Sequence, residues 1–148
     1  MIYVEAPAPI PETTHPKLFL AGGITGVRDW QADVVKYLQD LPILVMNPRR
    51  SRWDTGGPDL SYEQIKWEYD GLRRADLISF WFSFETLCPI TLYELGAHLM
   101  TTTPILVGVD KGYQRRQDIE VQTALVRPEI RIVYTLDDLV LQIKENIF

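Results

Sequence analysis

Glu94 is a residue whose type and position suit chemistry. It falls in the second turn of a helix expected over Pro89–Met100, where the positive end of the helix dipole favours an ionised carboxylate. Gly96 follows two residues later, and glycine costs about 1 kcal/mol relative to alanine inside a helix. We therefore expect that something packs or binds closely beside Glu94.

Glu68 is a second candidate, on a helix expected over Ser61–Ala75. It borders the sector that this helix is expected to bury, formed by Ile65, Tyr69, Leu72, Ala75 and Asp76. A carboxylate there is costly unless it is paired, hydrogen-bonded or faces a cleft, and an ion pair with Arg73 or another basic group is the structural alternative. Asp70 lies far from the sector and is interpreted as a solvated charge. Two carboxylates on neighbouring helices suit acetal chemistry, in which one attacks the anomeric carbon while the other exchanges a proton with the leaving group.

The loops offer weaker signals. Gly22 and Gly23 follow an apolar run, so their backbone N–H groups could approach a sugar or a phosphate. The spacing matches neither the dinucleotide-binding fingerprint nor a P-loop, and a tight strand-to-helix turn is the alternative. Trp53 could stack on a base. Neither histidine stands where it would activate Cys88 as a nucleophile, and no spacing of His, Cys or acidic residues predicts a metal site.

Five short apolar runs predict the strands that position these residues: Lys17–Ala21, Ile43–Met46, Leu77–Phe82, Ile105–Val109 and Ile130–Tyr134. They lack apolar–polar alternation, which suits strands buried on both faces of a parallel sheet. Helices are expected between and after them, over Arg28–Asp40, Ser61–Ala75, Pro89–Met100, Asp118–Val126 and Leu136–Ile147. This order predicts an α/β fold with a single doubly wound, mainly parallel five-stranded sheet, Rossmann-like or flavodoxin-like, with helices on both faces. Ligands of such sheets bind at the carboxyl ends of the strands.

Composition limits the class of protein. The 148 residues suit one α/β domain over 17–148, after an extended proline-rich N-terminal arm over 1–16. The net charge of −5 argues against a surface for nucleic acid or for an anionic membrane. The single cysteine excludes an internal disulfide and is typical of a reducing compartment. Because the sequence shows no signal peptide and no transmembrane stretch, we expect a cytoplasmic protein.

Five motifs in order resemble the nucleoside 2-deoxyribosyltransferase superfamily, and its nucleoside 2-deoxyribosyltransferase-like branch in particular. The resemblance spans about Lys17 to Tyr134. The motifs are Phe19–Gly26, Asn47–Arg50, Gln64–Glu68, Arg74–Asp76 and Thr91–Gly96. It implies that Glu94 is the nucleophile, which forms a glycosyl-enzyme intermediate at C1′. It also implies that Glu68, eight residues before Asp76, is a second active-site carboxylate.

The resemblance implies binding residues as well. The loop with Gly22, Gly23 and Thr25 lines the sugar site in the family, and we infer that Asn47, Pro48 and Arg49 approach the base or a phosphate. Two departures stand out. Relatives that act on nucleotides have a Ser-x-Gly-x-Gly run where this chain has Cys88–Leu92, although Thr91 offers a hydroxyl there. The second carboxylate is a glutamate where better-studied relatives have aspartate.

The expected function is cleavage or transfer of the N-glycosidic bond of a nucleoside or nucleotide. Water as the acceptor would make the protein a hydrolase, and a second base would make it a transferase. A non-catalytic nucleotide- or nucleoside-binding module of the same fold is the alternative. We expect no metal, no other cofactor and no nucleic-acid or membrane partner. By the same resemblance the chain forms a homo-oligomer, in which residues of Asp110–Gln122 could complete a neighbour's site.

Overall fold

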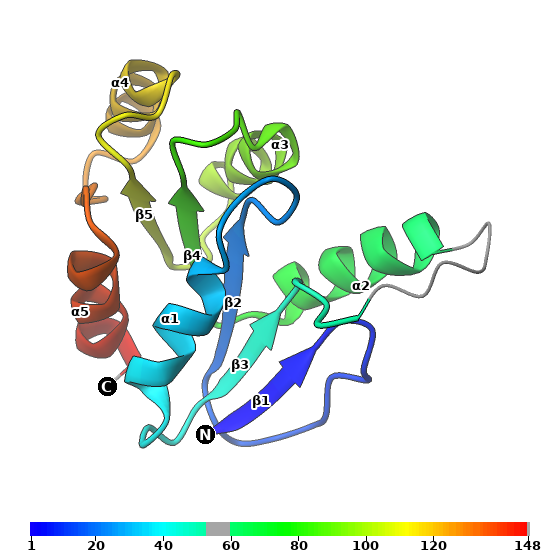
Figure 1. Cartoon of the computed structure of the whole chain (residues 1–148). Helices are drawn as coiled ribbons and strands as arrows, with labels where there is room; N and C mark the ends of the chain where they lie inside the picture. Colours follow the sequence, from blue (N-terminus) through cyan, green and yellow to red (C-terminus); the bar gives the residue numbers. More distant parts are fainter. Residues whose placement is uncertain (53–59, 148) are drawn as a thin grey trace.

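The computed structural model describes residues 1–52 and 60–147, in which strands and helices alternate along the chain (Figure 1). The strands are β1 Ile2–Glu5, β2 Lys17–Gly22, β3 Leu44–Asn47, β4 Leu77–Phe82 and β5 Ile105–Val109. The helices are α1 Trp30–Leu38, α2 Leu60–Arg74, α3 Pro89–Leu99, α4 Arg116–Val126 and α5 Leu136–Ile147. Each helix expected from the sequence is present, with its ends shifted by at most two residues.

The strands form one sheet in the order β1-β3-β2-β4-β5, and every pairing is parallel. This confirms the predicted doubly wound α/β fold. Every residue of β3, β4 and β5 is buried, as expected for strands covered on both faces. Helices α1 and α5 cover one face of the sheet, and α2 and α3 cover the other (Figure 1).

The membership of the sheet differs from the prediction at both edges. Ile2–Glu5 is strand β1, paired along its length with β3, so this part of the expected arm is a sheet element. The prolines of the arm all follow this strand and do not interrupt its hydrogen bonds. The expected strand Ile130–Tyr134 is wrong, because only Val133 pairs with β5, in a single bridge to Gly108. The carbonyl of Arg131 instead accepts a hydrogen bond from the Gln142 side chain of α5.

The topology indicates where a ligand would bind. From β2 the chain passes to β3 on one side and then returns across β2 to β4 on the other. The loops after β2 and β4 therefore lie on either side of the point where the strand order reverses, which is where α/β sheets bind ligands. Among the helices in the described part of the chain, none is both long and apolar enough to cross a membrane.

Candidate active site

Glu94 lies in the second turn of α3 and is partly buried. Burial, together with a smaller contribution from the negative charge of Glu68, raises the pKa of its carboxyl to about 8. The free protein therefore holds Glu94 protonated at pH 7, and the prediction of an ionised Glu94 is wrong. A helix dipole contributes about 0.3–1 kcal/mol, less than one pH unit, so it does not offset the desolvation.

Glu68 belongs to the face of α2 that packs against the rest of the protein. The predicted buried sector is wrong in part, since Ile65 is 64% exposed and Tyr69 is 51% exposed. The residues that are buried on α2 are Gln64, Trp67, Gly71 and Leu72. The buried face of α2 therefore differs from the predicted one, and the contacts of Trp67 explain the difference. Its ring contacts Phe19 of β2 at 6.0 Å between centroids, and its Nε1 donates to the Ala8 carbonyl at 2.8 Å. Glu68, the next residue, is turned inward beside it.

One glutamine holds the Glu68 carboxylate. Gln64 Nε2 donates to Glu68 Oε1 at 2.7 Å and to the carbonyl of Pro48 at 2.8 Å. Burial raises the pKa of Glu68, while the Gln64 hydrogen bond and the positive charge of Arg50 lower it. The alternative ion pair with Arg73 is absent from the described contacts of Glu68. The Arg73 guanidinium lies instead over the Tyr69 ring, 3.4 Å from its centroid.

Arg50 and Gln64 are functional candidates that the sequence analysis did not single out. The Arg50 side chain is only 4% exposed; its Nε donates to Gln64 Oε1 at 2.7 Å and its Nη2 to Glu63 Oε1 at 2.8 Å. A polar chain thus runs from Glu63 through Arg50 and Gln64 to Glu68. The available signal was the spacing of four between Gln64 and Glu68, which places the two side chains side by side on a helix.

The glycine-rich loop after β2 is shaped by close packing. A Cβ on Gly22 would lie 2.4 Å from the Trp30 ring, and one on Gly23 would lie 2.7 Å from Cys88 Sγ. The carbonyl of Gly23 accepts a hydrogen bond from Trp30 Nε1 at 3.2 Å. Both glycines are therefore required by their neighbours within the fold, and contact with a sugar stays a prediction.

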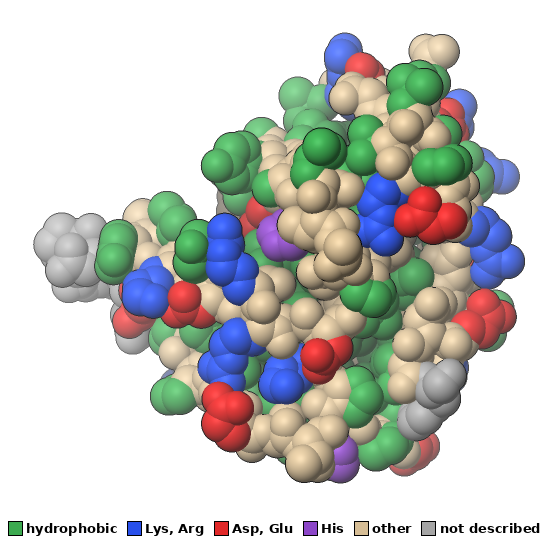
Figure 2. Space-filling view, turned by 180° about the vertical axis from the view of Figure 1, so that it is seen from behind, with side chains coloured by type: hydrophobic (Ala, Val, Ile, Leu, Met, Phe, Trp, Pro, Cys, Tyr) green, Lys and Arg blue, Asp and Glu red, His purple; other side chains and the backbone are tan. Residues whose placement is uncertain are grey.

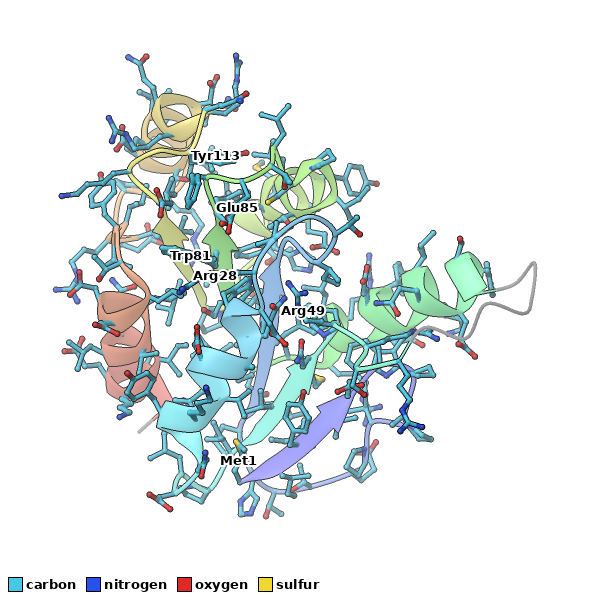
Figure 3. All side chains as sticks on the ribbon, viewed as in Figure 1. Met1, Arg28, Arg49, Trp81, Glu85 and Tyr113 are labelled. Atoms are coloured by element: carbon cyan, nitrogen blue, oxygen red, sulfur yellow. The ribbon has the colours of Figure 1, made fainter. Side chains whose placement is uncertain are left out.

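The polar groups of Asn47 and Arg49 form hydrogen bonds with other parts of the chain. Arg49 Nε donates to Gln31 Oε1 at 2.9 Å, and Nη2 donates to the carbonyls of Val27 and Arg28, each at 3.0 Å. Figure 3 shows Arg49 beside the loop that contains Arg28. Asn47 is 3% exposed; its Nδ2 donates to the Tyr3 hydroxyl at 2.8 Å, and its Oδ1 accepts from the Arg49 backbone N–H. Their predicted contact with a base or phosphate is untested.

The other predicted binding residues are scattered. Pro48 and Thr91 are buried, Thr25 is exposed on the loop after β2, and Trp53 lies outside the described residues. Nothing in the described part of the chain packs at Gly96, since no atom there lies within 4 Å of a Cβ placed on it; binding beside Glu94 stays a prediction.

The segment between β4 and α3 carries a third carboxylate, which sequence reasoning missed. Glu85 Oε1 accepts from the Arg28 backbone N–H at 3.5 Å, and its buried Oε2 has no hydrogen-bond partner among the described residues. Figure 3 shows Glu85 near the end of β4, on the same side of the sheet as Arg28. At the end of this segment Cys88 has left-handed backbone angles (φ 46°, ψ 57°), and Pro89 begins α3.

The arrangement is a pair of interacting carboxylates on α2 and α3. The pKa of Glu94 lies at about 8, so this carboxyl holds a proton at pH 7. Burial raises the pKa of Glu68 as well, but a hydrogen bond from Gln64 and the nearby Arg50 guanidinium partly offset that rise by stabilising its anion. Such a pair can supply both a nucleophile and a proton donor. Within residues 1–52 and 60–147, no group of three or more His, Cys, Asp and Glu side chains is placed to hold a metal ion.

Comparisons with known proteins agree with this architecture. The family model described as nucleoside 2-deoxyribosyltransferase like matches residues 15–113, which include both carboxylates. Among solved structures, a conserved protein from Enterococcus faecalis V583 is similar with a TM-score of 0.68 and 17% sequence identity. The similarity covers 88% of this chain and 98% of that one, and at this identity it shows the fold alone. The comparison with curated proteins finds no match.

Proposed function

Since the chain belongs to the nucleoside 2-deoxyribosyltransferase-like family, we propose that it cleaves or transfers the N-glycosidic bond of a nucleoside. The observation that carries this proposal is the coupling of Glu68 and Glu94 across two helices. The charge of Glu68 contributes to the raised pKa of Glu94, which supports the proposal that the two carboxyls act on one substrate. In the proposed reaction Glu94 attacks C1′ of the sugar and Glu68 manages the proton of the leaving base.

The pair holds one proton, and the departing base needs one proton. On substrate binding the proton passes from Glu94 to Glu68, which leaves Glu94 as a carboxylate. Glu94 then forms an ester bond to C1′ as the C1′–N bond breaks. The base nitrogen keeps the electron pair of that bond and takes the proton from Glu68.

The second half of the reaction restores the pair. Either water or a second base attacks C1′, and the ester oxygen of Glu94 departs with its electron pair. The attacking group gives up a proton to Glu68, so the two carboxyls again hold one proton between them. Water yields the free sugar, and a second base yields a new nucleoside.

Three observations favour a nucleoside over its 5′-phosphate. Pro89 stands in the first turn of α3 and offers no N–H to an anion. Arg49 Nε is engaged with Gln31 of α1, and its Nη2 is engaged with the loop after β2. Glu85 has a buried oxygen without a partner in the described structure, which suits a hydroxyl donor and opposes a phosphate.

A non-catalytic binding module is the second candidate, and the protonation of Glu94 favours it. A neutral carboxyl is a poor nucleophile. If no group accepts the proton of Glu94, the site would bind a nucleoside without attacking it.

Release of free base from a panel of nucleosides and their 5′-phosphates, measured by chromatography with mass detection, tests these proposals. Each substrate is incubated with and without an added acceptor base. We expect base release by the wild-type protein and a loss of at least 1000-fold in Glu94→Gln, with Asp70→Asn as the matched control on the exposed side of α2. Full activity of Glu94→Gln would refute the nucleophile. Nucleoside binding by calorimetry without any product would select the binding module.

We also propose that a second copy of the chain covers the outer side of α2 and α3. Large apolar side chains are exposed on these helices: Tyr62, Ile65, Tyr69, Ile90 and Tyr93. Figure 2 shows hydrophobic side chains on this side of the molecule. Gly96 leaves open space on α3, which would let a neighbouring backbone approach. Sedimentation should show an oligomer that Ile65→Ser weakens and Leu141→Ser, an exposed control on α5, leaves intact; a monomeric wild-type protein would refute this.

A further inference from the structure

We propose that Arg50 and Gln64 are positioning residues that hold Glu68 as the ionised member of the carboxylate pair in the free protein. This inference rests on the proposed function, because it concerns the same two carboxylates. It adds two side chains that act through Glu68, since Arg50 contacts Gln64 and Gln64 contacts the carboxylate.

Arg50 determines the orientation of the Gln64 amide. A guanidinium only donates hydrogen bonds, so the group facing Arg50 Nε at 2.7 Å must be the amide oxygen of Gln64. The NH2 group then faces the carbonyl of Pro48 and the Glu68 carboxylate. Both of these groups are acceptors, so the amide meets a suitable partner in all three of these hydrogen bonds.

The oriented amide selects the charged form of Glu68. Glu68 Oε1, at 2.7 Å from an N–H donor, is held as an acceptor, which favours the carboxylate over the protonated acid. If the amide were turned over, its oxygen would face Glu68 and favour the protonated form. Arg50 therefore controls the charge of Glu68 through Gln64, and its own positive charge acts in the same direction.

Arg50 and Gln64 are themselves held in place by the rest of the fold. Arg50 lies just after β3, and its Nη2 is paired with Glu63 of α2. The backbone before it is held at the edge of the sheet, since the Asn47 carbonyl accepts from the Ala6 N–H at 3.0 Å. Gln64 is 8% exposed, so solvent competes little for its hydrogen bonds. Strand β1 and the residue after it thus support the segment that carries Arg50, which orients the Gln64 amide.

The charged groups around Glu68 come from three elements. Arg50, from the segment after β3, stabilises its anion; Glu94, from α3, is its partner; and Glu63, from α2, pairs with Arg50. Arg50 and Gln64 lower the pKa of Glu68, which burial raises. The ionised Glu68 in turn raises the pKa of Glu94. The proton is thereby assigned to Glu94 in the free protein.

The rival explanation is that Arg50 and Gln64 only tie the end of β3 to α2. Both explanations predict a less stable protein when either side chain is removed. They differ in pH dependence. If the role is purely structural, removing either side chain lowers kcat/KM by the same factor at every pH. If the role is positioning, the removal shifts the acidic limb of the pH profile of kcat/KM, where Glu68 becomes protonated.

The first experiment is the pH profile of kcat/KM for base release by Gln64→Met, a substitution of similar volume without the amide. We expect the acid limb to move up by about one pH unit, so that activity falls more at pH 5 than at pH 7, by a factor of up to about ten. Lys66→Met, on the exposed side of α2, is the matched control and should keep the wild-type profile. Arg50→Lys keeps the positive charge but loses the planar guanidinium. This variant should retain more activity at acidic pH than Arg50→Met. A uniform loss at all pH values would overturn the proposal.

A second measurement does not depend on activity. Carbon-13 labelling of the glutamate carboxyl groups allows Glu68 and Glu94 to be titrated by NMR in the folded wild-type protein and in Gln64→Met. We expect the Glu68 midpoint to rise by about one pH unit in the variant. An unchanged midpoint would refute the positioning role even if base is released. A raised midpoint without base release by any protein would refute the proposed function and leave the positioning role standing.

Discussion

The substitution Glu94→Gln should make the stability of the protein less sensitive to alkaline pH. An amide has the shape of the protonated carboxyl and stays neutral at every pH. In the wild-type protein, burial and the charge of Glu68 hold the pKa of Glu94 at about 8, against an ordinary value of 4.5. The unfolded chain therefore releases this proton at a lower pH than the folded chain does.

The sign follows from linkage between proton binding and folding. Between pH 4.5 and pH 8 the folded state binds more protons than the unfolded state, so the free energy of unfolding falls as pH rises. With these two values and about 1.36 kcal/mol per pH unit, the loss from pH 6 to pH 9 is about 3 kcal/mol. The Glu94→Gln variant lacks this loss, and its free energy of unfolding relative to the wild type should rise by that amount.

Urea unfolding followed by fluorescence at pH 6, 7, 8 and 9 measures the difference. With a slope of about 2 kcal/mol per molar urea, the midpoint of the variant should gain roughly 1.5 M over the wild type across this range. Asp70→Asn is the control, because Asp70 forms an exposed ion pair with Lys66 on the same helix as Glu68. Parallel curves for the wild type and Glu94→Gln would refute the argument that the fold keeps this carboxyl neutral.

Three further substitutions test the packing that positions the site, each by urea unfolding at pH 7. Gly23→Ala should lower the free energy of unfolding by about 1–3 kcal/mol, since its Cβ would lie 2.7 Å from Cys88 Sγ. An unchanged midpoint would show that the Cys88 side chain moves aside without cost. Tyr3→Phe should cost about 1–2 kcal/mol because the buried Asn47 amide loses its acceptor, and a neutral result would mean that β1 does not hold this segment. Trp67→Phe should cost about 1 kcal/mol, because the Ala8 carbonyl between β1 and β2 loses its N–H donor, and it should increase proteolytic cleavage of the segment between these strands; equal cleavage would contradict that role.

Much of the fold was predictable because it depends on local patterns. The runs at Leu77–Phe82 and Ile105–Val109 match β4 and β5 residue for residue, since a short continuous apolar run is typical of a strand covered on both faces. Strand β1 was missed because the prolines that follow it dominate the first sixteen residues. Ile130–Tyr134 was wrongly predicted as a strand, because an apolar run does not reveal that the Gln142 side chain of α5 donates to the Arg131 carbonyl.

The two carboxylates and the helices that carry them followed from the sequence alone, through motif order and spacing. Their protonation did not, because a charge is set by burial and by neighbours that are distant along the chain. The same is true of the buried face of α2, which Ala8 and Phe19 select from outside the helix. Periodicity states which residues share a face; only the tertiary structure decides which face is covered, which polar groups meet, and hence that Glu94 holds the proton while Gln64 and Arg50 stabilise the charge on Glu68.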